Sequence, residues 1–289
     1  MEHAQPNGPG AEMSATRLRL DPPPLSRRLL PDALRSEWIK FRSVRSTYWT
    51  LLVTLVGMIG LGALFTTAFV AHFHHMGPQD RFEASRITSV ARSDGGFFLM
   101  QLAVGVLGVL VMTSEYATGS IRATLSAVPQ RRLVLAAKAM VFGAVVFVVS
   151  LASAFAAFFV GQAILSQIGQ GVSITAPGAL RGVFGTALYL TVIGLLSLGL
   201  GTIIRRTAGA IAALVALVLI LPGVVAALPS SWQNNIDPYL PSAAGAALIG
   251  RGPLTPDHIL SPWVGFAVFC AYAAAALLAG AVLLVRRDA

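Results

Sequence analysis

The chain has 289 residues, of which 55% are hydrophobic and 11% charged, with a net charge of +9 and a mean hydropathy of +0.73. Soluble domains carry about 25% charged residues, and several apolar runs here approach 20 residues. The composition therefore excludes an ordinary soluble domain and indicates an all-α integral membrane protein with several spans. Cys270 is the single cysteine, so a disulfide framework and a Cys-rich metal site are also excluded.

The first 47 residues are expected to lie outside the membrane core. Residues 1–30 are polar and contain three successive prolines, so we expect a disordered cytoplasmic tail. Residues 32–47 follow as a predicted amphipathic helix at the membrane interface, because Leu34, Trp38 and Phe41 share one helical face while basic residues lie off it. A charged flank of the first span is the alternative interpretation.

Six apolar stretches are long enough to cross a hydrocarbon core of about 30 Å. The fifth contains Pro222, which predicts a kink or a break near its outer end. The predicted spans are residues 48–71, 95–113, 134–165, 182–204, 208–228 and 263–285.

The distribution of Lys and Arg predicts the orientation. With the N-terminus inside, 16 of the 21 basic residues lie in inner segments and five in outer segments. The positive-inside rule then places both termini in the cytoplasm. The basic charge is thus a topology signal, and nucleic acid is not expected as a partner.

Two outer segments contain features of their own. Residues 229–262 are rich in proline around a short apolar stretch, which predicts either re-entrant pieces or an ordinary folded loop. His72, His74 and His75 follow the first span. Histidine can bind zinc or copper, but no acidic or cysteine ligand is close in sequence, so we assign no metal.

Catalytic motifs are missing from the chain. It has two lysines, Lys40 and Lys138, and neither is followed by Ser or Thr, so a GxxxxGK[ST] phosphate loop is excluded. HExxH and GxSxG are also missing, and no ionisable residue is expected deep in a span. We therefore expect neither an enzyme nor an ion-coupled carrier, and no bound cofactor. A transporter of this kind would take its energy from a partner.

The polar segment 113–138 is the longest interruption between spans on the predicted inner side. Ser120 is a favourable N-cap for a short helix over residues 121–126 that would end before Pro129. This helix would present Ile121, Leu125 and Val128 as apolar contacts, with Arg122 as a charge. A plain inner loop is the alternative, but it requires no such apolar residues.

The sequence SEYATGSIRATLSAVPQRRLVLAAK in this segment resembles the first cytoplasmic loop of ABC-2 type permeases, particularly actinobacterial ones. The segments LRSEWIKFRSVRSTYW and YLPSAAGAAL are similar to the same family, and the resemblance covers residues 31–289 as one transmembrane domain. Two details differ: Ser120 stands where Thr is commoner, and Gln130 separates the proline from the arginines.

The resemblance implies an exporter made of two permeases and two separate ATPase subunits that bind ATP and Mg²⁺. The loop helix would be the coupling helix that docks on the ATPase. By the same resemblance, Gly119 and Ser120 would begin this helix, Glu115 and Tyr116 would form its junction with the second span, and its docking face would comprise Ile121, Arg122, Thr124 and Leu125.

The substrate is not specified by these residues, although apolar spans suit an amphipathic or lipid-like molecule. The second permease would be another copy of this chain or a related one. Two alternatives from other classes remain: a membrane anchor or assembly factor that transports nothing, and an intramembrane enzyme, which the missing catalytic pair disfavours.

Overall fold

The computed structural model describes residues 29–73, 75–77, 79, 93, 95–121, 130–250 and 260–287, and the structural statements below refer to these residues. Almost all of the predicted tail lies outside them. Every regular element within these ranges is a helix. The long helices are α1 (Leu29–Ser43), α2 (Arg45–Phe73), α5 (Phe97–Ala117), α7 (Arg131–Leu165), α8 (Ala179–Ile204), α9 (Thr207–Val215) and α13 (Pro262–Arg287).

Shorter pieces complete the chain. A 3-10 turn, Ser166–Ile168, extends α7, and α9 continues through the π-helical turn Ala216–Ile220 into α10 (Leu221–Ala226). The predicted break in the fifth span therefore takes the form of a π-helix directly before Pro222. Proline lacks an N–H and displaces the preceding turn, which accounts for the altered hydrogen bonding there.

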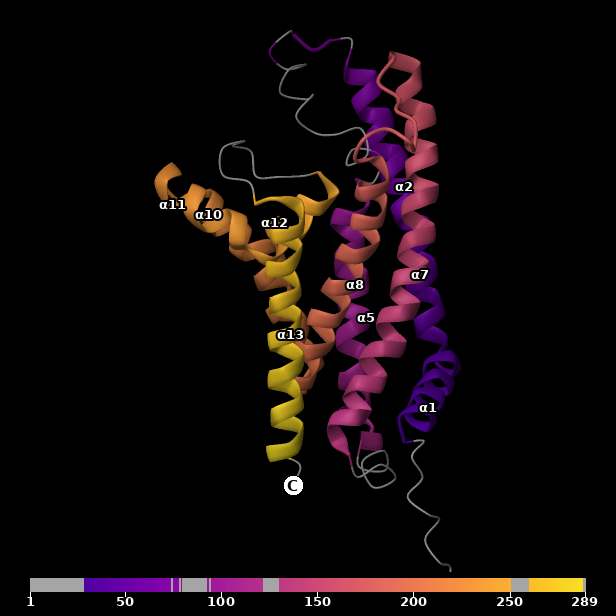
Figure 1. The fold of residues 1–289 in the computed structure, drawn as a ribbon, viewed down its shortest axis with the longest axis vertical. Helices are drawn as coiled ribbons and strands as arrows, with labels where there is room; N and C mark the ends of the chain where they lie inside the picture. The colour runs from indigo at the N-terminus through magenta and orange to yellow at the C-terminus, as the bar shows by residue number, and fades with distance from the viewer. Residues whose placement is uncertain are drawn as a thin grey trace, which may run out of the picture.

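Six helical stretches in the described ranges are long and apolar enough to cross a membrane, as predicted. Their bounds differ from the prediction mainly at the lower end of the bundle in Figure 1, where α5 continues to Ala117 and α7 already begins at Arg131. The predicted spans ended at residue 113 and resumed at residue 134. Hydropathy marks where polar residues begin, whereas backbone hydrogen bonds continue the helix beyond that point.

Helix α8 is the centre of the bundle. It packs against α5, α7 and α13 (Figure 1), and 67% of its most apolar stretch is buried, compared with 22% for α2. Small residues permit this close packing: a Cβ on Gly194 would lie 2.8 Å from the Phe142 ring, and one on Gly199 would lie 2.8 Å from Ala276. The exposed apolar faces of the outer helices suit contact with lipid.

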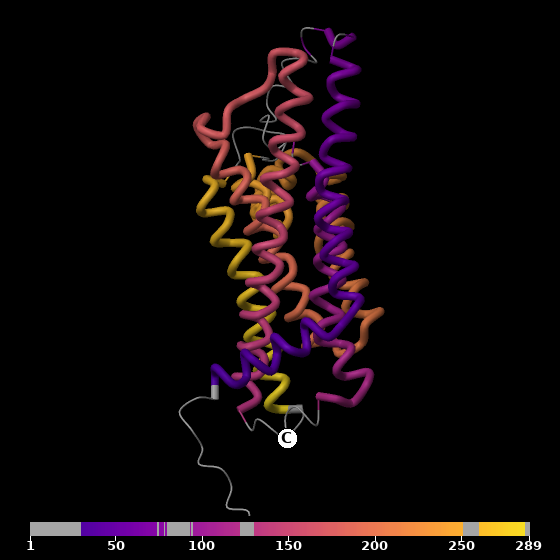
Figure 2. Tube along the Cα trace, turned by 90° about the vertical axis from the view of Figure 1, so that its right-hand side faces the viewer, coloured from indigo at the N-terminus to yellow at the C-terminus, as the bar shows by residue number. Residues whose placement is uncertain are grey.

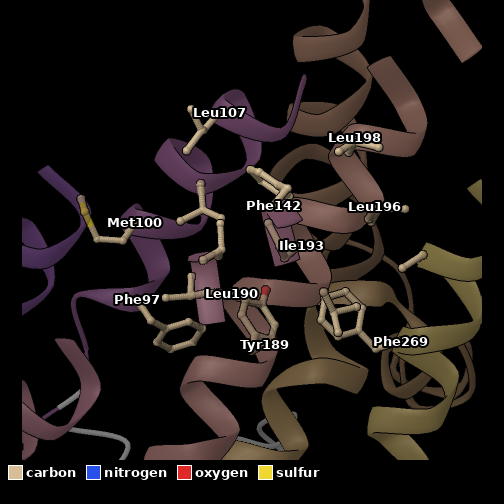
Figure 3. Close-up of a cluster of buried hydrophobic side chains, with 14 of the residues drawn as sticks. Phe97, Met100, Leu107, Phe142, Tyr189, Leu190, Ile193, Leu196, Leu198 and Phe269 are labelled. Atoms are coloured by element: carbon tan, nitrogen blue, oxygen red, sulfur yellow. The ribbon is translucent and has the colours of Figure 1, made fainter. Parts of the chain in front are cut away.

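The core around α8 is dominated by aromatic and branched side chains (Figure 3). Tyr189 lies between Phe97, at 5.2 Å in an edge-on arrangement, and Phe269, stacked at 5.1 Å. Its hydroxyl donates a 2.5 Å hydrogen bond to Gln101 Oε1, and Gln101 Nε2 donates to the Phe98 carbonyl. Burial of these polar groups is therefore compensated by pairing.

The segment before the sixth span contains α11 (Ser230–Ile236), the 3-10 turn Asp237–Tyr239, α12 (Pro241–Ala246) and the 3-10 turn Ala247–Ile249. Helix α12 packs on α13, and the last turn packs on both α8 and α13. Leu248 and Ile249 are buried. The short apolar stretch thus packs against α8 and α13. Whether it enters the membrane as re-entrant pieces stays a prediction.

Helix α1 crosses one end of the bundle, the end at which α13 also finishes (Figure 2). The predicted interfacial helix over residues 32–47 is wrong in one respect, because the helix breaks at Val44. The Tyr48 hydroxyl donates to the Arg42 carbonyl across this corner at 3.0 Å. Tyr48 therefore belongs to α2, and its hydrogen bond stabilises the corner between α1 and α2.

Candidate functional site

Four charged side chains from three helices form a cluster where α1 crosses the bundle. Lys138 Nζ of α7 donates to Glu37 Oε2 of α1 at 2.6 Å and to Glu115 Oε1 of α5 at 2.8 Å. Lys40 Nζ donates to Glu37 Oε1 at 2.8 Å and to Glu115 Oε1 at 3.5 Å. We call Glu37, Lys40, Glu115 and Lys138 the charge cluster. It joins the crossing helix to the end of α5 and the beginning of α7.

The charge cluster is buried on one side and open on the other. The side chains of Glu37 and Lys138 are each 5% exposed and that of Glu115 is 11% exposed, whereas Lys40 is 38% exposed. Two carboxylates and two ammonium groups leave the cluster without net charge when all four are ionised. This balance matters because isolated charges are costly to bury, and paired ones tolerate burial only with good hydrogen-bond geometry.

The helical register of α1 explains why Glu37 points inward. Ala33, Glu37 and Phe41 recur every four residues and face the bundle: Ala33 and Glu37 are buried, and the Phe41 ring lies 6.3 Å from that of Phe142. Trp38 is exposed and Leu34 is half-buried. The three residues predicted to share one apolar face, Leu34, Trp38 and Phe41, therefore do not have the same surroundings. Phe41 packs against the bundle, whereas Trp38 is exposed.

Electrostatics within the cluster favour the ionised forms on α1. Burial by itself would raise the pKa of the Glu37 carboxyl, but the charge and hydrogen bond of Lys138, together with those of Lys40, outweigh it and lower that pKa. Burial would likewise lower the pKa of the Lys40 ammonium, yet the hydrogen bond and charge of Glu37 raise it. Both groups on α1 thus stay charged near neutral pH.

Two residues of the cluster were interpreted differently from the sequence. The resemblance places Glu115 at the junction with the second span and names no partner for it. It lies in the last turn of α5, and its partners are lysines. Lys138 was counted with the inner loop, whereas it is buried about two turns inside α7.

The loop after α5 is described only at its beginning. Gly119 has a left-handed φ of 72°, which suits glycine because it lacks a Cβ, and Ser120 and Ile121 are helical. The Thr118 hydroxyl donates to the Ser114 carbonyl and to the Ser120 hydroxyl. Ile121 is 7% exposed and joins the apolar core, so its side chain packs inward in place of the outward contact predicted for it. Arg122, Thr124, Leu125 and Val128 lie outside the described residues.

Tyr116, in the last turn of α5, contacts Arg205, the residue that ends α8 at the same end of the bundle. The guanidinium of Arg205 lies 5.0 Å from the centre of the Tyr116 ring, and Arg205 itself has a positive φ of 61°. Its Nη2 donates to the Leu283 carbonyl at 3.3 Å, and Arg131 Nη1 donates to the Leu284 carbonyl at 3.2 Å. These contacts hold the last turn of α13 against α5, α7 and α8.

A cavity of about 410 Å³ opens beside the charge cluster. Its walls come from the corner between α1 and α2 and from one face of α5. The lining is apolar along α5, at Leu107, Leu110 and Val111, and becomes polar at Ser114 and Thr118. Glu115 Oε2 is buried and has no hydrogen-bond partner among the described residues. The lining of the cavity therefore changes from apolar to polar along α5.

The histidines after α2 do not form a metal site in the described part of the chain. The rings of His72 and His75 are 6.5 Å apart, and His74 lies outside the described residues. No group of three or more His, Cys, Asp or Glu side chains that could hold a metal occurs among the described residues.

No protein-family model and no curated protein matches the chain. The functional argument therefore depends on the geometry of the chain itself, and above all on the charge cluster and the helices that it connects.

Proposed function

We propose that this chain is the membrane-spanning permease subunit of an ATP-binding-cassette exporter of the ABC-2 type. It would move an amphipathic or lipid-like substrate outward, and a separate ATPase subunit would bind and hydrolyse ATP with Mg²⁺. The complex would contain two permeases and two ATPases in a bacterial plasma membrane, with both termini of this chain in the cytoplasm.

The observation that carries this proposal is the charge cluster. The segment expected to contact the ATPase leaves α5 at Ala117, two residues after Glu115, and returns as α7 at Arg131, seven residues before Lys138. Glu115 and Lys138 are bound to each other, and Lys138 is also bound to Glu37 of the crossing helix α1. A force on the loop would therefore act on α1, α5 and α7 together, which is the connection that a partner-driven transporter needs.

The docking surface would lie on the loop helix beyond Ile121. Since Ile121 is buried, we assign it the role of anchoring the loop, and the docking face becomes Arg122, Thr124 and Leu125. Gly119 and Ser120 would set the direction in which this helix leaves the membrane. An arginine at such a face can pair with carboxylates of a partner in two-pronged geometry.

Co-purification from the native host tests the proposal. The tagged chain should retain a protein with a GxxxxGK[ST] motif, and the complex should hydrolyse ATP, whereas the chain alone should show no hydrolysis above a mock preparation. Arg122→Glu should reduce the retained ATPase at least tenfold, because a charge reversal removes an attractive contact and adds a repulsive one.

Arg206→Glu is the matched control, since Arg206 is an exposed arginine on the short link between α8 and α9 at the same end of the bundle. It should leave the yield of the complex unchanged. An equal yield from wild type and Arg122→Glu would refute the docking assignment. A chain that retains no ATPase in any preparation would favour the membrane anchor, and ATP-independent turnover by the isolated chain would favour an enzyme.

A further inference from the structure

Two arginines from different helices contact the same turn of α13. Arg131 Nη1 donates to the Leu284 carbonyl at 3.2 Å, and Arg205 Nη2 donates to the Leu283 carbonyl at 3.3 Å. The two carbonyls belong to consecutive residues, so two guanidinium groups are held at one turn. Helices α7 and α13 contact each other, and the beginning of α7 lies beside the end of α13 in both views of the bundle (Figures 1 and 2).

Three exposed arginines adjoin these contacts in the sequence. Arg132 follows Arg131 in the first turn of α7, and Arg206 follows Arg205 on the link between α8 and α9. Arg286 lies in the last turn of α13. We call Arg132, Arg206 and Arg286 the arginine patch. It brings positive charge from three parts of the chain to one end of the bundle.

No carboxylate in the described part of the chain forms an ion pair with the arginine patch. The ion pairs there belong to the charge cluster, and none includes Arg132, Arg206 or Arg286. A concentration of like charge raises the electrostatic free energy and attracts a counter-ion. Guanidinium groups bind phosphate through two parallel hydrogen bonds, so the patch favours a ligand with a phosphate group.

The surface beside the arginine patch is apolar and exposed along two helices. On α13, Leu278 and Val282 precede Arg286 at intervals of four residues, and they are 67% and 41% exposed. On α7, Met140 lies two turns after Arg132 and is also exposed. Residues with these spacings share a helical face. Each face therefore leads from an arginine at the helix end to apolar side chains further along the bundle.

We propose that the arginine patch binds an anionic phospholipid, of the phosphatidylglycerol class. Arg132 and Arg286 donate to the phosphodiester, and Arg206 contributes positive charge. The acyl chains lie on the apolar faces that contain Met140 and Val282. The net charge of the lipid decides the selectivity, because a zwitterionic headgroup already offsets its phosphate with its own ammonium group. This binding depends on neither transport nor an ATPase.

Lipid titration of the purified full chain in detergent, followed by native mass spectrometry, tests the headgroup. Dioctanoyl phosphatidylglycerol should bind at least about tenfold more tightly than dioctanoyl phosphatidylcholine, because only the glycerol lipid brings uncompensated negative charge. Glycerophosphoglycerol, the same headgroup without acyl chains, should bind at least about tenfold more weakly than the lipid, since it makes no apolar contact. Equal affinity for the two lipids, or for the lipid and its free headgroup, would overturn the assignment.

Removal of the arginine patch locates the site. Arg132→Gln combined with Arg206→Gln and Arg286→Gln should weaken phosphatidylglycerol binding at least about tenfold. The matched control removes the same amount of charge from exposed arginines of α1 and the start of α2, at the same end of the bundle: Arg35→Gln, Arg42→Gln and Arg45→Gln. Binding to the control should stay within about twofold of wild type, because salt screens distant charges. An equal loss in both variants would indicate attraction to the overall charge and refute a site at the patch.

Arg286→Gln alone decides the outcome if the triple variant does not fold. Its loss of one phosphate contact should weaken phosphatidylglycerol binding about fivefold, whereas Arg35→Gln should bind as wild type does. Unchanged binding in Arg286→Gln would contradict the proposed contact. A triple variant that binds the lipid normally but no longer retains a co-purifying protein would assign the patch to an acidic protein surface and overturn the lipid site.

Discussion

Replacing Lys138 with methionine should show how strongly the charge cluster holds α1 to the bundle. The ammonium of Lys138 lies 2.6 Å from Glu37 Oε2 and 2.8 Å from Glu115 Oε1, and all three side chains are largely buried. Removing one partner of a buried ion pair costs about 3–5 kcal/mol, because the remaining charge is left uncompensated. Lys40 stays in contact with both carboxylates. We therefore expect a loss at the lower end, about 3 kcal/mol.

Equilibrium unfolding in mixed micelles, followed by the helical circular dichroism signal, measures this loss. Lys40→Met is the control, because this lysine is 38% exposed and a solvated ion pair contributes only about 1 kcal/mol or less. A triple variant, Glu37→Gln with Glu115→Gln and Lys138→Met, removes both the pairs and the buried charges. It should be more stable than Lys138→Met alone, since neutral replacement of a whole buried ion pair is often tolerated.

Two results would refute this reasoning. If Lys138→Met destabilises the protein no more than Lys40→Met, the cluster is solvated and does not anchor α1. If the triple variant is less stable than Lys138→Met alone, the carboxylates stabilise the fold through contacts other than those with Lys138.

Three further predictions concern pH, topology and packing. The ion pairs lower the pKa of Glu37, so its carboxylate stabilises the fold above about pH 4.3. This contribution is lost as the pH falls through the lowered pKa of the folded state. Unfolding measured as a function of pH should therefore show a loss of stability in acid that is smaller in Glu37→Gln. In a Cys270→Ser background, Ser43→Cys should react with an impermeant thiol reagent from the cytoplasmic side and Ser231→Cys from the outside, and labelling of both from one side would contradict the topology. Gly245→Ala should cost about 1–3 kcal/mol, because a Cβ there would lie 2.6 Å from the Tyr189 ring, whereas Gly60→Ala, with no atom within 4 Å, should cost nothing measurable in the same unfolding assay.

The membrane-spanning helices were predictable because each one is formed by a single continuous run of apolar residues. An apolar run of about 20 residues must satisfy its backbone hydrogen bonds internally to cross a bilayer, so hydropathy alone indicates a helix. The same argument is weak at the helix ends. Ser114 and Glu115 are polar, and they suggested a loop after residue 113, yet α5 includes both.

The charge cluster was not predicted because its members are far apart in the chain. Glu37 and Lys138 are separated by 101 residues, and Glu115 and Lys138 by 23. Charges near the ends of spans are expected from the positive-inside rule, so Lys40 and Lys138 were interpreted as topology signals. One local signal was present: Ala33, Glu37 and Phe41 share a helical face with an acid at its centre, and an acid on an otherwise apolar face needs a buried partner.

The arginines that hold the end of α13 have a consequence for the order in which the protein is assembled. Helix α13 follows α7 and α8 in the chain, so Arg131 and Arg205 are synthesised before Leu283 and Leu284. Their guanidinium groups then meet carbonyls at the negative end of the helix dipole. Two arginines that the sequence alone marks only as basic flanks of α7 and α8 thus form the binding site for a helix that is synthesised after them.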